Sequence, residues 1–382
     1  MVKPGNTPIH WPAAWRNIPS ADLLDGTAIE ISDPAVALTK GVWPGVRMSR
    51  DGANADAGPT GAAWIDSNGW LARLTAARHP GAVFIDAPPP ANARLTAASY
   101  LIAMADAAAY GARWVISLDD AVAAGVADRK PDALATWKRI ADAAGFFAGH
   151  REWADWTPEA IIGVASDFAG PNEFLGQEVL NLLDRAGMHF RIVLKDRLPD
   201  ERFAGLRAVL YADQDPPAAL LRKQILAFVE AGGLLICAPS WGDAPGKPAA
   251  AAPVPAYSER LLGKGRVAIA AAAPEDPYVL ANDAVVLVSH RHDIVRCWNS
   301  GAFASYYTVA PGRAKAAVHL LFYANRGPDA ASVRVVGRWR TAEISTVEDP
   351  APRPVKMETQ KDAVEVYLPQ VSQYVALQLE GS

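Results

Sequence analysis

Short apolar runs alternate with amphipathic helical patterns along the first 156 residues. Four of the runs predict β-strands, at 27–31, 42–48, 82–85 and 113–118. Three stretches between and after them predict helices, at 68–77, 96–110 and 131–148. Strands that alternate with helices are typical of a parallel sheet. A closed (β/α)₈ barrel needs about 250 residues, so we expect only a partial, TIM-barrel-like βα layer of four strands.

The same alternation continues after residue 159, with short loops. Strands are predicted at 160–167, 190–194, 208–211, 234–238 and 267–270. Helices are predicted at 172–186 and 217–230. Short loops between alternating strands and helices indicate a doubly wound layer of flavodoxin-like type. The proline- and alanine-rich stretch 244–255 is predicted to be a surface loop.

Beyond residue 313 the helical pattern disappears and short alternating runs replace it. Strands are predicted at 318–323, 332–336, 342–347, 363–368 and 374–379. Such runs, separated by Pro, Gly and Asp, are typical of a β-sandwich. The sequence therefore predicts an α/β protein of three domains. These are a truncated barrel-like domain at 1–156, a flavodoxin-like domain at 157–312 and a β-sandwich at 313–382.

Composition excludes several classes of protein. The 382 residues are 51% hydrophobic and 20% charged, which is too apolar for a disordered chain. The formal charge is −4, from 37 Lys and Arg against 41 Asp and Glu, and phosphate neutralisation needs clustered cations. We therefore expect no nucleic acid partner. The start of the chain lacks a signal-peptide pattern and no window of about 18 apolar residues occurs, so we expect a cytoplasmic protein without a membrane partner.

Metal and cofactor sites are not predicted. Cys237 and Cys297 are 60 positions apart, without a neighbouring Cys or His at ligand spacing. His290 and His292 are two positions apart, a spacing that points side chains away from each other on a strand or helix. In the second layer, 166–173 follows the first strand, but its glycine pattern does not fit a phosphate loop. There Asn172 is predicted to cap the next helix, and we expect this layer to carry no chemistry.

The order of the three domains resembles the β-galactosidases of glycoside hydrolase family 42 and related glycosidases. Tyr110-Gly-Ala-Arg-Trp-Val-Ile-Ser-Leu is similar to a late barrel step of those enzymes, and Gly232-Gly-Leu-Leu-Ile to a step of their amidotransferase-like domain. The resemblance implies a TIM barrel, a trimerisation domain and a small sandwich. It also implies a homo-oligomer, for which we leave dimer and trimer open. The family carries catalytic glutamates after its fourth and seventh barrel strands, and no Glu follows any of the four predicted strands here.

Candidate catalytic residues lie at the carboxyl ends of the predicted strands, where loops vary over a rigid scaffold. Asp86 follows the third strand, and Asp119 and Asp120 follow the fourth. Glycoside cleavage needs two carboxyl groups about 5.5 Å apart for retention, or about 6.5–9.5 Å apart for inversion. Asp86, paired with Asp119 or Asp120 from the adjacent strand, could act as acid and nucleophile or base. The alternative is that these carboxylates cap helices and solvate the edge of the sheet.

Tryptophans near the same strand ends suggest a carbohydrate site, because sugar rings stack on aromatic faces. Nine of the twelve tryptophans, Trp43 among them, lie at or before residue 156. Candidate substrate-binding residues are Arg47, Trp64, Asp66, Asn68 and Trp114. Large aromatic residues also fill cores, so packing is the alternative role. Two functions follow: a hydrolase acting on glycosidic bonds, or a non-catalytic relative that binds a sugar or serves as an assembly subunit.

Overall fold

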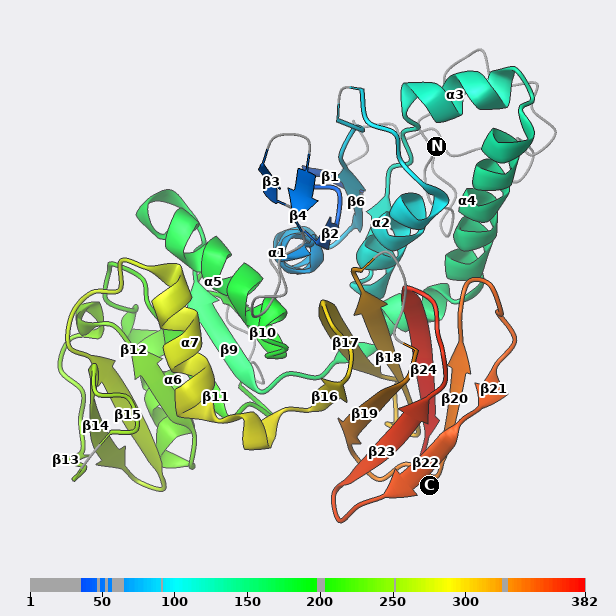
Figure 1. Cartoon of the computed structure of the whole chain (residues 1–382). Coiled ribbons are helices and arrows are strands. Elements are labelled where there is room, and N and C mark those ends of the chain that lie inside the picture. The colour runs from blue at the N-terminus through cyan, green and yellow to red at the C-terminus, as the bar shows by residue number, and fades with distance from the viewer. Residues whose placement is uncertain are drawn as a thin grey trace. The chain divides into compact units, whose positions relative to one another are not determined.

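Figure 1 shows the computed structural model of the chain, which describes residues 36–46, 49–51, 54–56, 65–90, 92–197, 203–250, 252–324 and 329–381. The chain divides into two compact units. Unit 1 comprises Met1–Pro158 and Val295–Ser382, and unit 2 comprises Glu159–Ile294. Each unit has its own hydrophobic core. The division into three domains stays a prediction.

The βα layer of unit 1 is built on a parallel sheet. Its strands, in the order β1-β6-β7, are β1 (Val36–Lys40), β6 (Ala82–Asp86) and β7 (Arg113–Trp114). Two antiparallel pairs accompany it, formed by β2 (Gly45–Val46) with β5 (Ile65–Asp66) and by β3 (Ser49–Asp51) with β4 (Asn54–Asp56). The described residues form no closed barrel, so this layer is an open sheet.

The strands of this layer differ from the sequence prediction in two places. The prediction of a parallel strand at 42–48 is wrong, since only the antiparallel strand β2 forms in the described part of this run. Pro44 lacks the backbone amide that a ladder of hydrogen bonds requires. The parallel strand is β1, which lies earlier in the chain. The run 113–118 is shortened to β7. The predicted strand at 27–31 lies outside the described residues.

Helices pack on this sheet and on one another in unit 1. They are α1 (Gly69–Arg78), α2 (Ala97–Ala109), α3 (Asp120–Ala127) and α4 (Pro131–Gly149), followed by the 3₁₀ helix η3 (Arg151–Asp155). A capping box begins α2, in which the side chains of Thr96 and Ser99 each accept the other's backbone amide. The many alanines of α2 are buried and let it pack closely against α4. The short helix α3 was not predicted, and Asp119 is its N-cap residue.

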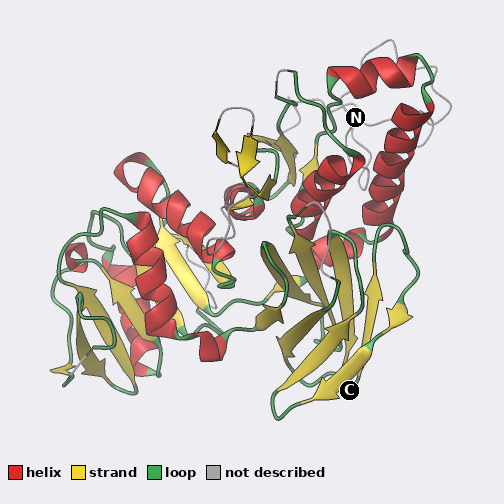
Figure 2. Ribbon diagram, viewed as in Figure 1, coloured by secondary structure: helices red, strands yellow, loops and turns green. Residues whose placement is uncertain are grey.

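Two antiparallel sheets complete unit 1 (Figure 2). One has the order β16 (Val295–Trp298), β19 (Ala331–Val336), β23 (Ala363–Leu368) and β22 (Lys356–Thr359). The other has the order β21 (Arg353–Pro354), β20 (Thr341–Ser345), β24 (Tyr374–Glu380), β18 (Lys315–Phe322), β17 (Phe303–Val309) and β8 (Thr157–Pro158). The strands predicted beyond residue 313 are confirmed as β18, β19, β20, β23 and β24. The sheets begin earlier than predicted, because β16 and β17 precede residue 313.

Unit 2 contains a seven-stranded sheet. Its order is β10 (Phe190–Leu194), β9 (Ile162–Ser166), β11 (Ala208–Tyr211), β12 (Leu234–Cys237), β15 (Gly265–Ala270), β14 (Tyr257–Leu262) and β13 (Lys247–Pro248). The first five strands are parallel, and β14 and β13 are antiparallel additions. The helices are α5 (Glu173–Arg185), α6 (Ala219–Glu230) and α7 (Pro277–Val288), with 3₁₀ helices η4 (Gly170–Asn172), η5 (Pro239–Trp241) and η6 (His290–His292). Of these, α7 and β14 were not predicted, and β13 interrupts the predicted loop.

Candidate functional site

The carboxyl edge of the parallel sheet in unit 1 carries Asp86, one of the predicted catalytic residues. Lys40, the last residue of β1, pairs in register with Asp86, the last residue of β6, and Ile85 pairs with Trp114 of β7. The segments that follow the three strands therefore leave the sheet at one edge. In parallel βα architectures this edge is where functional side chains collect.

A buried polar network lies behind this edge. The Asn68 side chain accepts a hydrogen bond from Val42 N (2.8 Å), and its amide donates to Val42 O (2.9 Å) and to Asp106 Oδ2 (2.9 Å). Asp106 is completely buried, and its other oxygen accepts a 2.6 Å hydrogen bond from Tyr323 Oη. A Cβ at Gly41 would lie 2.6 Å from Asn68 Oδ1, so only glycine fits there. Both amide hydrogens of Asn68 are thus engaged inside the protein, and its predicted substrate contact stays a prediction.

Asp119 is the N-cap of α3. Its Oδ1 accepts hydrogen bonds from Ala121 N (3.0 Å) and Val122 N (3.1 Å). Its Oδ2 accepts from Tyr100 Oη (3.0 Å) and Leu95 N (3.2 Å). Burial raises the pKa of Tyr100 well above its usual range, so the hydroxyl stays protonated and donates. The structure therefore places Asp119 in the capping role that the sequence left as an alternative, and its catalytic role stays a prediction.

The other predicted acids differ in their surroundings. Asp86 is half-buried at the end of β6, and its carboxylate has no hydrogen-bond or ion-pair partner within the described ranges. Asp120 is the exposed first residue of α3 and is equally without a partner in the described part of the chain. Asp66 is half-buried and already interacts with another group of the protein. Asp86 and Asp120 are thus the carboxylates that remain available to a ligand.

Aromatic rings pack at the same edge. Trp43 makes edge-to-face contacts with Tyr100 (5.4 Å between centroids) and Trp114 (5.1 Å). Trp114 is 1% exposed and belongs to the core. This is the packing role that the sequence left as an alternative to substrate binding. Trp43 is half-buried, and its indole nitrogen donates to Pro88 O (3.2 Å), two residues beyond Asp86. A partly exposed ring thus lies beside the loop that carries Asp86. Arg47 and Trp64 lie outside the residues whose side chains are described.

A second group of charged side chains follows the strands of unit 2. Lys195 Nζ lies 2.9 Å from Asp167 Oδ2 and 2.5 Å from Asp213 Oδ2. Burial alone would lower the pKa of Lys195, but the hydrogen bonds to the two carboxylates outweigh it and raise the pKa well above its usual range. The lysine is therefore charged at every working pH. Sequence reasoning missed Asp213 and Lys195, because only folding brings the ends of β10 and β11 beside β9.

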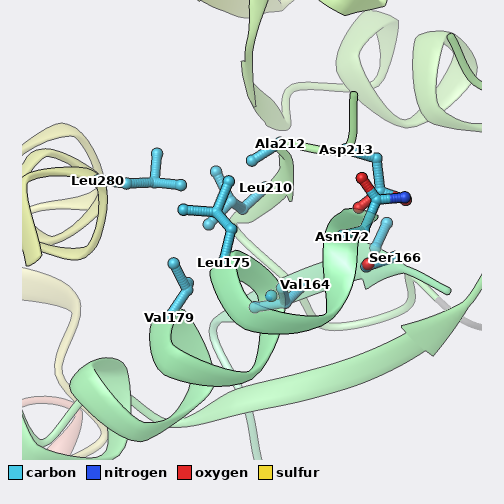
Figure 3. A pocket seen from close by; sticks show the side chains of 11 residues that line it. Val164, Ser166, Asn172, Leu175, Val179, Leu210, Ala212, Asp213 and Leu280 are labelled. Atoms are coloured by element: carbon cyan, nitrogen blue, oxygen red, sulfur yellow. The ribbon is translucent and has the colours of Figure 1, made fainter. Parts of the chain in front are cut away.

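Of these charged residues, Asp213 lines one end of a small cavity between α5, β9 and β11 (Figure 3). Its polar end is formed by Ser166, Asn172 and Asp213, and its other wall is lined by Leu175, Val179, Leu210 and Leu280. The cavity has a volume of about 10 Å³, which is space for about one water molecule. The crevice where the strand order reverses is the usual ligand site of such sheets, but here it has no room for a small molecule.

Asn172 is the N-cap residue of α5, as the sequence predicts, but its side chain does not act as the cap. No side-chain capping bond is formed there. The amide of Asn172 donates instead to Asp167 Oδ1 (3.1 Å), and its oxygen accepts from Gln214 N (2.9 Å). A capping bond would need the side-chain oxygen of Asn172 as acceptor, and Gln214 N already donates to that oxygen.

Comparison with known proteins gives fold similarity alone. No protein-family model matches, and no curated protein matches. Among solved structures, α-L-fucosidase isoenzyme 2 from Paenibacillus thiaminolyticus is 11% identical with a TM-score of 0.55, covering 82% of this chain and 62% of that one. A β-galactosidase from Bacillus circulans sp. alkalophilus is 10% identical with a TM-score of 0.52, covering 81% and 61%.

A rhamnosidase from Novosphingobium sp. PP1Y is 11% identical with a TM-score of 0.54, and the similarity covers 91% of this chain and 35% of that one. The chain thus spans less than two thirds of the length of each of these proteins. Within the described residues, no helix is long and apolar enough to cross a membrane. The fold is a mixed α/β arrangement of glycosidase-like type.

Proposed function

We propose that the chain is a carbohydrate-active protein that acts on glycosidic bonds at the carboxyl edge of the β1-β6-β7 sheet. Fold similarity alone does not fix a function, so the proposal rests on one observation. Asp86 is a half-buried carboxylate at a strand end, without a partner in the described part of the chain, next to the loop on which Trp43 packs. An unengaged acid beside a partly exposed indole fits a sugar ring and its glycosidic oxygen.

The second carboxyl group of the proposed reaction is Asp120 rather than Asp119. The four hydrogen bonds that Asp119 accepts would have to break before it could accept or donate a proton. Asp120 is exposed and has no such bonds within the described residues. One acid would protonate the leaving oxygen, while the other would attack the sugar or activate a water molecule. Which of Asp86 and Asp120 plays each role is left open.

A panel of chromogenic aryl glycosides, with fucosides, galactosides and rhamnosides included, tests this proposal. We expect the wild-type chain to hydrolyse at least one, and Asp120→Asn to lower the rate by two or more orders of magnitude. Asp132→Asn is the matched control, because Asp132 also lies in the first turn of a helix, α4, at an exposed position. Equal losses in the two variants would remove Asp120 from the site.

The second candidate function is a non-catalytic relative that binds a sugar or serves as an assembly subunit. The engagement of Asp119 as a cap favours it, since that leaves fewer free acids at the edge. Binding of a glycan by the wild type, without hydrolysis of any glycoside in the panel, would establish this alternative.

We further propose that unit 2 is flavodoxin-like, because its parallel strands follow the order second-first-third-fourth-fifth along the chain.

The two antiparallel sheets of unit 1 are proposed to form a β-sandwich, and the chain is proposed to be a homo-oligomer. The open edges of the sheets support oligomerisation, because exposed strand edges invite pairing with another chain. Light scattering at micromolar concentration tests it. A mass of two or three times 40.6 kDa is expected, and a strict monomer would contradict it.

A further inference from the structure

A cavity of about 490 Å³ lies at the amino end of β7, away from the strand ends where we place glycoside chemistry. This volume is within the range of small-molecule sites. It is enclosed by the end of α2, the end of α4, η3 and one residue of β18, all within unit 1. Its principal side chains are Arg113, Phe147, His150, Arg151, Trp153 and His319.

Of the Asp, Glu, Lys and Arg side chains that line the cavity, only that of Arg113 is not exposed. Its guanidinium has no hydrogen-bond or ion-pair partner among the residues that the structure describes, and it lies over the face of Phe84, 5.4 Å from the ring centroid. Burial, and then the charge of Arg151, lower the pKa of Arg113. A partly buried cation beside a like charge is unfavourable unless an anion joins it.

The remaining charges of the cavity do not supply that anion. Glu152 and Asp155 also line it, but both are exposed on η3, where water and salt screen their charge. Neither forms an ion pair with Arg113 in the described part of the chain. The guanidinium therefore keeps its donors available, and guanidinium donors match the geometry of carboxylate and phosphate groups.

The wall around Arg113 suits an apolar or ring-shaped body. His150 stacks on Trp153 at 4.3 Å between centroids and also contacts Phe146. His319 is buried in the wall, and its Nδ1 lies 2.7 Å from Tyr374 Oη. Its Nε2 has no hydrogen-bond partner among the described residues. Aromatic faces with a few convergent polar groups are the usual composition of a small-molecule pocket.

We propose that this cavity binds a small organic anion whose carboxylate or phosphate group pairs with the guanidinium of Arg113, while its body lies on the Trp153 and His150 rings. Arg151 would add a second, exposed cation to the entering anion. The site is independent of the proposed glycoside chemistry, since it uses the opposite end of β7 and none of the candidate acids.

Isothermal titration calorimetry of the full chain tests the site, with glucuronate and inorganic phosphate as probes and neutral glucose as the uncharged comparison. The wild type is expected to bind one glucuronate, with weaker binding of phosphate and none of glucose at this site. Arg113→Gln is expected to weaken glucuronate binding at least tenfold. Arg340→Gln is the matched control, because Arg340 is an exposed arginine of the same unit without a partner in the described residues.

A second variant keeps the test decisive if Arg113→Gln does not fold. Ala154 is exposed on η3 and lines the cavity, so Ala154→Trp fills the cavity while Arg113 keeps its charge. We expect this variant to lose glucuronate binding as well. The proposal is overturned if the wild type binds neither anion, or if Arg113→Gln or Ala154→Trp binds glucuronate as tightly as Arg340→Gln.

Discussion

We predict that His319 makes the stability of unit 1 depend on pH. The side chain belongs to β18 and is buried against Trp153. Burial is the main cause that lowers its pKa to about 3, and the charge of His150 lowers it further. In the unfolded chain the pKa of histidine is about 6.5. Between these two values the unfolded chain binds a proton that the folded chain rejects. The neutral His319 therefore costs the protein no stability above about pH 6.5. Below that pH the unfolding free energy falls progressively as the pH approaches 3.

The magnitude follows from the two pKa values. At pH 5 the unfolded state gains about 2 kcal/mol from protonating this histidine, whereas at pH 7.5 the gain is close to zero. The wild type should therefore lose about 2 kcal/mol of unfolding free energy over this interval from His319 alone. In His319→Gln this contribution is absent, so the variant should show a shallower dependence on pH, whatever its stability at pH 7.5.

Urea unfolding at a series of pH values from 7.5 to 5 measures the effect. The readout is the difference in pH dependence between wild type and variant, because the carboxylates that titrate elsewhere are common to both. His79→Gln serves as control, since His79 is exposed at the end of α1. Parallel pH profiles for the wild type and His319→Gln would refute the reasoning, as would an equal change in His79→Gln.

Three further substitutions have definite expected outcomes. Tyr323→Phe removes the 2.6 Å hydrogen bond to buried Asp106 and should cost about 1–3 kcal/mol, measured by urea unfolding. Asp119→Ala removes the cap of α3 and should cost about 1–2 kcal/mol, while glycoside turnover, measured on the folded variant, stays within twofold. Lys195→Met leaves Asp213 buried without its cation and should cost about 3 kcal/mol. Burial raises the pKa of Asp213, so this loss should shrink as the pH falls, because protonation of the carboxyl removes the uncompensated charge.

Local patterns predicted the regular elements well where periodicity was strong. The strands β10, β11 and β23 occur at the predicted residues, and α2 and α4 end within one residue of the predicted ends. The helix α3 was missed because it has eight residues, carries Gly125, and depends on the bonds of Asp119 to its first amides. A cap of this kind is visible in a sequence only as one of several roles for an aspartate.

Contacts between distant residues could not be predicted. Tyr323 and Asp106 are 217 positions apart, and no spacing rule joins them. The return of the chain to unit 1 was hidden for the same reason, since β8 pairs with β17 across the whole of unit 2. The cavity at Arg113 likewise needs three segments distant in sequence, and an arginine at the start of a strand carries no sign of it.

The sequence predicted which acids are candidates for the site but not how each is bonded, and their role in a site stays a prediction. The rule that function collects at the carboxyl ends of parallel strands located Asp86, Asp119 and Asp120 from the sequence. It could not tell that Asp119 is engaged by four hydrogen bonds while Asp86 has none within the described residues. Trp43 was named only in passing, yet it is the half-buried ring next to the Asp86 loop.

The most direct test of the proposed function is the turnover number of the wild type and of Asp86→Asn on an aryl glycoside that the wild type hydrolyses. Removing a carboxyl group that takes part in the chemistry costs orders of magnitude in rate, whereas a substitution at a strand end usually costs little stability. We predict that Asp86→Asn lowers kcat at least a thousandfold with its melting temperature unchanged. Turnover within twofold of the wild type, or a wild type that hydrolyses no glycoside, would contradict the proposal.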